Sequence, residues 1–342
     1  FTPVLFAILL VILSCSKESE REKSPLIQLC GEELGTEWMV TVLTNHKFDQ
    51  EDLRMEITQN LQASDKLFSH RRSDSELHRF NANLSVNPIS IHPELLDLFR
   101  HAQWMHQQSE GAFDPTIAPI VNLWYFNPDR ISRSSIPTDR QIDETLKLTG
   151  IENLTLLSNG RVQKKIPRLQ IDFSGSAKGE IVDQLCELLI RWNFDNFLVE
   201  IGGKVRAHGK GRRGEGWLVS LKGGDSPLQS KVAVTLRNYA VASCYNFKEQ
   251  SPVAYPTTPH LMDPRTGRPI LNELMAVNSF APTARDADAW ATALMILGPV
   301  EGMKKADQMD MVVRFCLKKG NSSEFISSQA FQRLFLQDGR NP

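Results

Sequence analysis

IDFSGSAKGEIVDQLCELLIRW, residues 171–192, decides the fold of this chain. Just before the glycine-containing turn, RLQIDF (168–173) alternates apolar and polar residues as a half-buried strand does. After the turn, residues 180–192 carry apolar side chains at helical spacing, and FLVEI (197–201) has a strand-like composition again. The stretch therefore predicts strand, turn, helix and strand in close succession.

The rest of the chain mixes the same two kinds of element without a regular alternation. WMVTVL (38–43) predicts a strand, residues 49–68 and 93–109 predict helices, and a last clear helix begins near Asp286 and stops at Gly298-Pro299. A repeating βαβ pattern is missing, and no internal repeat is visible. We therefore expect an α+β fold with mixed or antiparallel sheets and packed helices, in two intimately joined subdomains.

Composition excludes a general polyanion-binding role. The chain has 342 residues, of which 41% are hydrophobic and 23% charged, and 39 Lys and Arg stand against 40 Asp and Glu. A net charge of −1 provides no long-range field for nucleic acid, so any anion site must be local. The cysteines after residue 15 have no spacing typical of a metal cluster, and the sequence does not say whether any two of them pair.

The first fifteen residues, FTPVLFAILLVILSC, resemble the end of an export signal. Their apolar run is too short for a membrane span, which needs ~20 residues, and Ser14-Cys15 resembles a bacterial lipobox. Residues 1–15 are thus expected to be a signal with a clipped start and a lipidated Cys15, residues 16–30 a polar tether, and 31–342 the folded domain. This interpretation predicts a membrane-anchored lipoprotein of the bacterial cell envelope. The alternative is a buried strand or helix.

The SGSAKG turn (174–179) places an acidic strand end, Asp172, next to the first residues of a helix. Free backbone N–H groups at a helix N-terminus suit phosphate, and Gly175 and Gly179 permit close backbone approach. The turn lacks the spacing of a nucleotide-binding glycine motif, so an ordinary strand-to-helix connection is the alternative.

The stretch RDADAWATALMILG (285–298) carries a sharper pattern. Asp288 and Thr292 are four residues apart on the expected helix, so their oxygens project from one face, with Asp286 in the same first turn. Carboxylate and hydroxyl oxygens suit Mg²⁺ that is shared with a phosphate ligand. The alternative is structural, because acidic residues favour helix N-termini and Thr can bond its own backbone.

Two basic stretches allow a structural interpretation. In HLMDPRTGRPI (260–270), Asp263 to Gly267 fit a tight turn, whereas His260 is unexplained by the turn and suits proton transfer or a phosphate contact. KVRAHGKGRR (204–213) carries five cationic side chains. These form either an anion-binding patch or, as we expect, a solvated hairpin tip.

In this order and approximate spacing, six segments resemble the ApbE-type FAD:protein FMN transferases. They are FSHRRSDSELHRFN (68–81), GAFDPTIAP (111–119), IDFSGSAKGEIVD (171–183), EIGG (200–203), HLMDPRTGRP (260–269) and APTARDADAWATALMILGP (281–299). The resemblance extends from about Gly35 to the C-terminus. It implies the flavin transferase fold, FAD as substrate, Mg²⁺ as cofactor, and transfer of FMN to a threonine hydroxyl of a target flavoprotein with release of AMP.

The resemblance also implies roles for particular residues. Asp288 and Thr292 would be side-chain metal ligands, with the Gly175 carbonyl as a third. His260 and Asp288 would be the catalytic residues, His260 lying beside the reacting phosphate. The FAD site would be lined by residues of several segments, namely Leu34, Arg71, Ala112, Phe113, Asp114, Asp172, Lys178 and Met262.

The chain departs from the family pattern at three places. Arg71 stands where many members have a tyrosine that stacks on the ligand, and Arg can stack on an aromatic face, although it is a different platform. Ser243-Cys244-Tyr245 stands where a Thr-Ser-Gly run is usual, so Tyr245 is expected to narrow the site or to replace the missing stack. Lys204 follows the double glycine, where a neutral or acidic residue is more usual.

Three functions remain open at this point. The first is FMN transfer. The second is an Mg²⁺-dependent FAD pyrophosphatase, in which water replaces the target hydroxyl and the products are FMN and AMP. The third is a flavin-binding lipoprotein without catalysis, an alternative that the departures at Arg71 and Tyr245 leave open. The products formed from FAD distinguish the three, and none of them involves nucleic acid.

Overall fold

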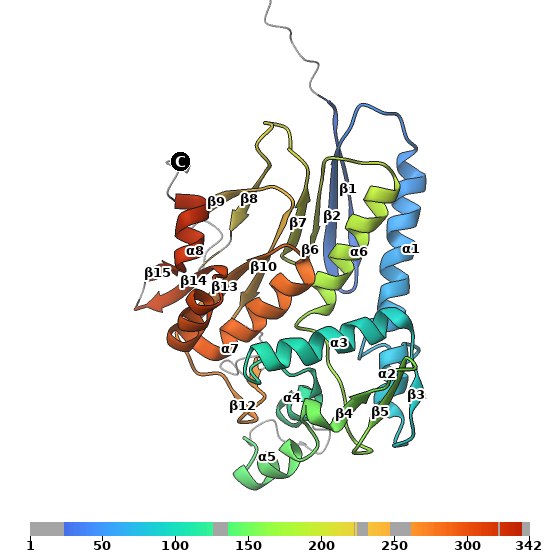
Figure 1. Ribbon diagram of the computed structural model, residues 1–342, viewed down its shortest axis with the longest axis vertical. Coiled ribbons are helices and arrows are strands. Elements are labelled where there is room, and N and C mark those ends of the chain that lie inside the picture. Colours follow the sequence, from blue (N-terminus) through green and yellow to red (C-terminus); the bar gives the residue numbers. More distant parts are fainter. Residues whose placement is uncertain are drawn as a thin grey trace, which may run out of the picture.

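The computed structural model describes residues 24–125, 136–221, 223, 232–246, 261–320 and 322–336. Figure 1 shows a large sheet with α1, α6 and α7 beside it, and a smaller part below that contains α2, α3, α4, α5 and a small sheet. The helices in chain order are α1 (Gln50–Phe68), α2 (Glu76–Ala82), α3 (Pro93–Gln108), η1 (Pro115–Ile117), α4 (Ala118–Tyr125), α5 (Asp139–Leu146), η2 (Ile151–Asn153), α6 (Ala177–Arg191), α7 (Ala284–Gln308), α8 (Gln329–Phe331) and η3 (Gln332–Leu336).

All strand pairs in the described residues are antiparallel, and the large sheet has the order β1-β2-β6-β7-β10-β13-β14-β15. The strands are β1 (Leu26–Glu33), β2 (Thr36–Leu43), β3 (Ile89–Ser90), β4 (Leu154–Leu156), β5 (Arg161–Lys164), β6 (Phe197–Ile201), β7 (Lys204–His208), β8 (Trp217–Leu221), β9 (Val232–Leu236), β10 (Tyr239–Tyr245), β11 (Met262–Asp263), β12 (Arg268–Pro269), β13 (Leu274–Ala281), β14 (Val312–Lys319) and β15 (Ser322–Ser327). The expected α+β class with antiparallel sheets is confirmed.

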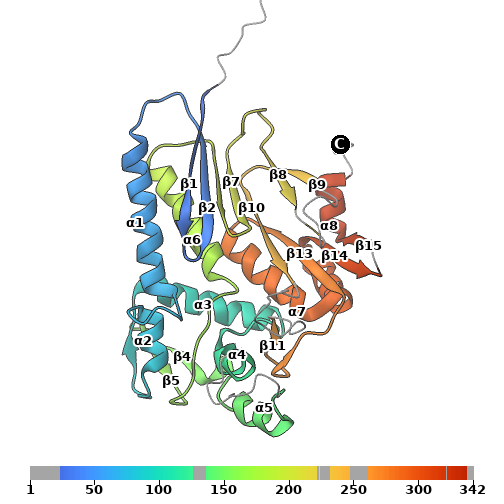
Figure 2. The same ribbon diagram turned by 180° about the vertical axis from the view of Figure 1, so that it is seen from behind.

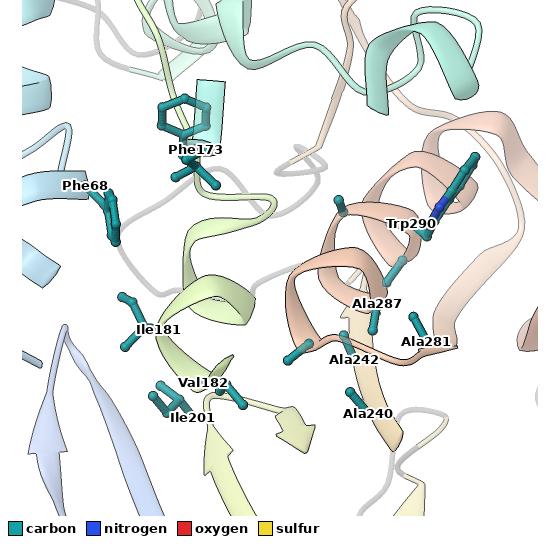
Figure 3. Packing of buried hydrophobic residues seen from close by; sticks show 14 of the residues in the cluster. Phe68, Phe173, Ile181, Val182, Ile201, Ala240, Ala242, Ala281, Ala287 and Trp290 are labelled. Atoms are coloured by element: carbon teal, nitrogen blue, oxygen red, sulfur yellow. The ribbon is translucent and has the colours of Figure 1, made fainter. Parts of the chain in front are cut away.

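The main core lies where α6 and α7 cover the large sheet. Ile181 and Val182 of α6 and Ala287 and Trp290 of α7 are all buried, and Figure 3 shows Val182 near Ile201 of β6 and Ala287 near Ala242 of β10. Small side chains on α7 let its backbone approach the sheet closely, and close-packed contact of this kind is what fixes a helix on a sheet. The N-terminal ends of both helices are thereby held next to each other.

Local capping explains where α7 begins. The Thr283 side chain accepts the backbone N–H of Asp286 at 3.1 Å, so α7 begins at Ala284. The predicted stop at Gly298-Pro299 is confirmed, because Gly298 has a non-helical backbone (φ 80°, ψ −179°), and a second helical segment that follows it directly extends α7 to Gln308. Glycine tolerates that backbone conformation and proline suits a helix start, so the pair ends the first segment of α7 and begins the second.

Two expectations need correction. Residues 168–173 are not a strand: Leu169, Ile171 and Phe173 are buried as the alternation predicted, but Asn81 forms hydrogen bonds with both the N–H and the carbonyl of Ile171, at 2.8 Å each. A side-chain amide thus replaces the partner strand. The expected tether of residues 16–30 is also too long, because residues 26–30 already pair with β2 within β1.

The signal and lipidation predictions concern Cys15 and residues 1–23, which lie outside the described residues. Over the part of the chain that the structure describes, no helix is long and apolar enough to cross a membrane. Of the cysteines within that part, Cys30, Cys186 and Cys244 are free thiols, and Cys316 is buried.

Candidate functional site

A cavity of about 620 Å³ lies between the start of α6, the middle of α7 and the segments 112–117 and 261–264. Ten of the residues predicted for the site line it: Arg71, Ala112, Phe113, Asp114, Asp172, Gly175, Lys178, Met262, Asp288 and Thr292. These residues come from sequence positions more than 200 apart (71 to 292), and the packing of α6 against α7 brings them together. This cavity is the candidate site.

Leu34 is not among the residues that line this cavity. It lies in the β1–β2 turn and lines an adjoining cavity of about 1210 Å³, which shares Gly202, Ser243 and Tyr245 with the candidate site. The larger cavity is not the better candidate, because none of Lys178, Lys204 and Asp288 lines it. The role of Leu34 beside a flavin therefore stays a prediction.

Asp288 is the most buried acidic group of the site, with 2% of its surface exposed. Its Oδ2 accepts the backbone N–H of Gly179, at the start of α6, at 3.1 Å. Its Oδ1 lies 3.4 Å from the Nζ of Lys204, which is itself buried at the start of β7. Both carboxylate oxygens thus face groups of positive potential, as a buried carboxylate requires.

Thr292 lies one helical turn beyond Asp288 on α7. Its Oγ1 donates to the carbonyl oxygen of Asp288 at 3.2 Å and lies 3.4 Å from the carbonyl oxygen of Gly175. A Cβ added at Gly175 would lie 3.1 Å from the ring of Phe113 and 3.2 Å from the Thr292 side chain, so a larger residue would push this carbonyl away. The three predicted oxygen donors are therefore neighbours.

These oxygen donors are of the kind that a hard cation binds. Among the described residues, no three or more His, Cys, Asp or Glu side chains gather as a metal cluster. Asp288, Thr292 and the Gly175 carbonyl supply one carboxylate, one hydroxyl and one backbone oxygen, all of the type that Mg²⁺ accepts when phosphate oxygens and water complete its shell. The residues fit Mg²⁺ as a metal shared with a substrate and do not form a closed protein cage.

Lys178 and Lys204 both line the cavity, together with Arg71. Burial lowers the pKa of Lys178, which follows the SGS turn at the start of α6. Burial also acts to lower the pKa of Lys204, but the charge and hydrogen bond of Asp288, together with Cys244 and Tyr245, outweigh burial and the net pKa is raised. The KVRAHGKGRR stretch is therefore not a solvated tip at its beginning, because Lys204 faces Asp288 and Arg206 forms a 2.7 Å ion pair with Asp183.

Asp172 and Arg71 also line the cavity. The Oδ1 of Asp172 accepts from the backbone N–H of Ser174 at 2.8 Å and from its hydroxyl at 2.5 Å. The ring Nδ1 of His70 lies 3.3 Å from the same oxygen. His70 was not predicted, although its place directly before Arg71 in FSHRRSD was the available signal. It contacts the same Asp172 oxygen as Ser174 does.

Asp286 does not belong to the site, although it is in the same helical turn as Asp288. Its carboxylate accepts from the Nε2 of His101 on α3 at 2.8 Å and does not line the cavity. Burial acts to raise the pKa of Asp286, but His101 and Thr283 outweigh it and the net pKa is lowered. The structural interpretation of an acidic helix start is thus correct for Asp286.

The GAFD segment is held by its own aspartate. Asp114 Oδ1 accepts from the backbone N–H and the hydroxyl of Thr116 at 2.8 and 2.6 Å, which begins η1. The Nδ1 of His106 lies 3.3 Å from Asp114 Oδ2, within ion-pair range although poorly aligned for a hydrogen bond. Asp114 raises the pKa of His106, so the segment carries a pH-dependent contact.

We expect that contact to contribute stability at acid pH. Because the pKa of His106 is raised in the folded protein, its contribution is complete below the unfolded value of about 6.5 and is lost as pH rises through the folded value. The substitution His106→Asn should lower the free energy of unfolding by about 1 kcal/mol near pH 5 and by clearly less near pH 9. Urea denaturation at both pH values measures this difference, and an equal loss at both would contradict the assignment.

The β11–β12 hairpin lies between α7 and α4, as the view from behind shows (Figure 2). The backbone N–H groups of Thr266 and Gly267 donate to the Asp263 carbonyl at 3.2 and 2.8 Å, which confirms the predicted turn. Arg265 binds the carboxylate of Asp263 and Arg268 that of Asp139, so neither arginine faces the cavity. His260 lies outside the described residues, and its catalytic role stays a prediction.

The departures at the end of β10 also line the cavity. Ser243, Cys244 and Tyr245 all contribute to its wall, and burial raises the pKa of the Cys244 thiol to about 11. Lys204 and Ser243 were not predicted as site residues. Their signals were the cation after Gly202-Gly203 and the position of Ser243 at a strand end, and neither pattern is specific without the fold.

The chain matches known proteins over almost its whole length. The model of the ApbE family matches residues 34–315. The FAD:protein FMN transferase of Vibrio cholerae is 32% identical over 334 residues, covering 96% of this chain and 97% of the relative, and that of Escherichia coli is 29% identical over 346 residues, covering 99% and 98%.

Solved structures agree with the sequence matches. The flavin transferase ApbE from Vibrio cholerae has a TM-score of 0.79 at 31% identity, covering 91% of this chain and all (100%) of that chain. The apo flavinyl transferase ApbE from Pseudomonas stutzeri has a TM-score of 0.81 at 28% identity, covering 91% and 97%. This fold with this cavity is that of an enzyme of the flavin transferase class. More narrowly, the chain belongs to the ApbE family.

Proposed function

We propose that this enzyme transfers FMN from FAD to a threonine hydroxyl of a target flavoprotein and releases AMP, in an Mg²⁺-dependent reaction. The observation that carries the proposal is the meeting of Asp288, Thr292 and the Gly175 carbonyl with Lys178 and Lys204 in one cavity of a flavin transferase fold. A diphosphate brings negative charge that such a site neutralises, and phosphoryl transfer depends mainly on neutralisation and positioning.

In the proposed reaction the acceptor hydroxyl oxygen bonds to the FMN phosphorus while the bond from this phosphorus to the bridging oxygen breaks. AMP leaves with that electron pair, and the hydroxyl proton must pass to a base. We propose His260 for this role, because an imidazole accepts protons near neutral pH. Asp288, Thr292 and the Gly175 carbonyl would hold Mg²⁺, which would neutralise charge on the diphosphate oxygens.

The residues of the chain position FAD for this step. Lys178, at the start of α6, lines the cavity, and it would bind the diphosphate together with the helix N-terminus. Phe113 and Met262 offer apolar surface to the flavin, and Arg71 offers a planar cation to an aromatic ring. Asp172 is fixed by Ser174 and His70, so its second oxygen is available to a ligand hydroxyl or amine.

Incubation with FAD, Mg²⁺ and a flavoprotein that carries an acceptor threonine tests the proposal by intact-protein mass spectrometry. We expect the target to gain the mass of FMN, and AMP to form in equal amount. Release of FMN and AMP without attachment would instead establish a pyrophosphatase, and absence of both products would leave a flavin-binding protein. A target with its threonine changed to valine is the matched control.

We also propose that Cys15 is acylated and that the enzyme is anchored at the bacterial cell envelope, facing the periplasm or the cell exterior. The support is the apolar run before Ser14-Cys15 and the polar residues after it. Expression with a labelled fatty acid should mark the wild-type protein in the membrane fraction, and Cys15→Ser should remove the label. Equal labelling of both proteins would contradict the proposal.

A further inference from the structure

Lys204 is a buried cation placed directly on the carboxylate proposed to bind the metal. Its ammonium is 3.4 Å from Asp288 Oδ1 and 3.3 Å from the carbonyl oxygen of Ser243, and 8% of the residue is exposed. The backbone fixes this placement, because Lys204 begins β7 after the turn at Gly202-Gly203 and pairs with Ala242 of β10. The ammonium therefore stays near Asp288.

The ammonium of Lys204 forms an ion pair with one carboxylate of the described residues. Among the described residues, Asp288 is the only carboxylate within ion-pair distance of Lys204 Nζ. On the other side of Asp288, the Gly179 N–H occupies Oδ2. A divalent cation that approaches Oδ1 thus meets a fixed positive charge a few ångströms away, and like charges at such a distance repel by several kcal/mol even at an effective dielectric of about 20.

An incoming diphosphate changes this balance, because its oxygens accept hydrogen bonds from an ammonium. Lys204 lines the same cavity as Lys178 and Thr292, so its flexible side chain can turn from Asp288 to a ligand oxygen within the site. We propose that Lys204 keeps the metal position on Asp288 closed in the free enzyme, and that the diphosphate of FAD opens it by taking the ammonium. Metal and diphosphate then bind together, each strengthening the other.

The inference rests on the proposed function for the identity of the ligand, and it adds an order to the binding. A purely structural ion pair would stabilise the fold without linking two ligands. Linkage is reciprocal, so the factor by which a diphosphate strengthens metal binding equals the factor by which the metal strengthens diphosphate binding. That factor is what separates a positioning residue from a structural one.

Titration with Mn²⁺, followed by electron paramagnetic resonance of the free ion, tests the proposal on the whole protein. It is made without nucleotide and with ADP as a diphosphate probe, and a titration of ADP alone corrects for Mn²⁺ bound in solution. We expect Lys204→Gln to bind Mn²⁺ alone at least about tenfold more tightly than the wild type. We also expect ADP to strengthen Mn²⁺ binding at least about tenfold more in the wild type than in Lys204→Gln.

Lys204→Arg, which keeps the charge, should retain the strong coupling, and Lys210→Gln, at an exposed lysine in the same segment, should behave as wild type. Equal Mn²⁺ affinity of wild type and Lys204→Gln without ADP would overturn the inference and leave the proposed function intact. If Lys204→Gln does not fold, the wild type decides, because Mn²⁺ binding that is independent of ADP also overturns it. Failure of the wild type to bind Mn²⁺ even with ADP would overturn the proposed metal site as well.

Discussion

Asp288→Asn is expected to lower the rate of FMN transfer on the order of 1000-fold, the largest effect predicted for a single side chain. Under the proposed function, Asp288 is the only carboxylate that holds the metal, and an amide oxygen carries no compensating charge. The loss should be smaller at high Mg²⁺ than at limiting Mg²⁺, because mass action partly restores binding. Single-turnover rates of target flavinylation over a range of Mg²⁺ concentrations measure it.

Two controls separate lost chemistry from lost structure. Asp286→Asn changes a carboxylate in the same turn of α7 that binds His101 outside the cavity, so it should keep transfer within a few-fold of wild type, about the size of a modest structural effect. Asp288→Asn also leaves the Lys204 ammonium without its acid, and a buried unpaired charge costs about 3–5 kcal/mol. Thermal unfolding must therefore show a folded variant, and full transfer by that variant at limiting Mg²⁺ would refute the metal assignment.

Gly179→Ala is expected to destabilise the protein by about 3 kcal/mol or more, because it overpacks the contact between α6 and α7. An added Cβ would lie 2.3 Å from the carbonyl oxygen of Ala284 and 2.8 Å from the Cα of Arg285. Both atoms belong to the backbone, so no side chain can move aside. Separation of the two helix starts would also weaken the hydrogen bond from the Gly179 N–H to Asp288.

Helix propensity alone would predict that Gly179→Ala stabilises the protein, whereas we expect it to destabilise the protein. Gly179 lies inside α6 without a positive φ, where alanine would otherwise be favoured by about 1 kcal/mol. Gly35→Ala is the matched control: at φ 68° with no atom within 4 Å of the added Cβ, it should cost only about 1–2 kcal/mol of backbone strain. Chemical denaturation of both variants measures the difference, and a Gly179→Ala protein as stable as wild type would disprove the packing argument.

The helices were predictable because their apolar stripes and caps are local. Residues 49–68 and 93–109 agree with α1 and α3 to within a residue, and WMVTVL lies within β2. The absence of a strand at 168–173 was not predictable, because Asn81, which satisfies the backbone of Ile171, lies 90 residues earlier in the chain. Alternating burial is the same in both cases, so the pattern alone could not distinguish a strand from a segment held by a side-chain amide.

The candidate site, too, has features that local sequence predicts and features that only tertiary packing sets. Asp288 and Thr292 share a helical face because they are four residues apart, so the sequence alone predicts this relation. That Asp286, two residues earlier, turns to His101 while Asp288 turns to Gly179 follows from the position of α3 and α6 around α7. No local rule contains that information.

The sequence by itself determined the α+β class, the helical segments, the turn from Asp263 to Gly267 and the spacing of Asp288 and Thr292, since each depends on neighbouring residues. The tertiary structure alone decided that Lys204 meets Asp288, although the lysine is far away in the chain and belongs to a basic stretch that suggested a solvated hairpin. Strand pairing of β7 with β10 and the close approach of α6 to α7 bury that pair together. A contact between distant residues depends on the whole packing, because only the folded core fixes where β7 begins relative to α7.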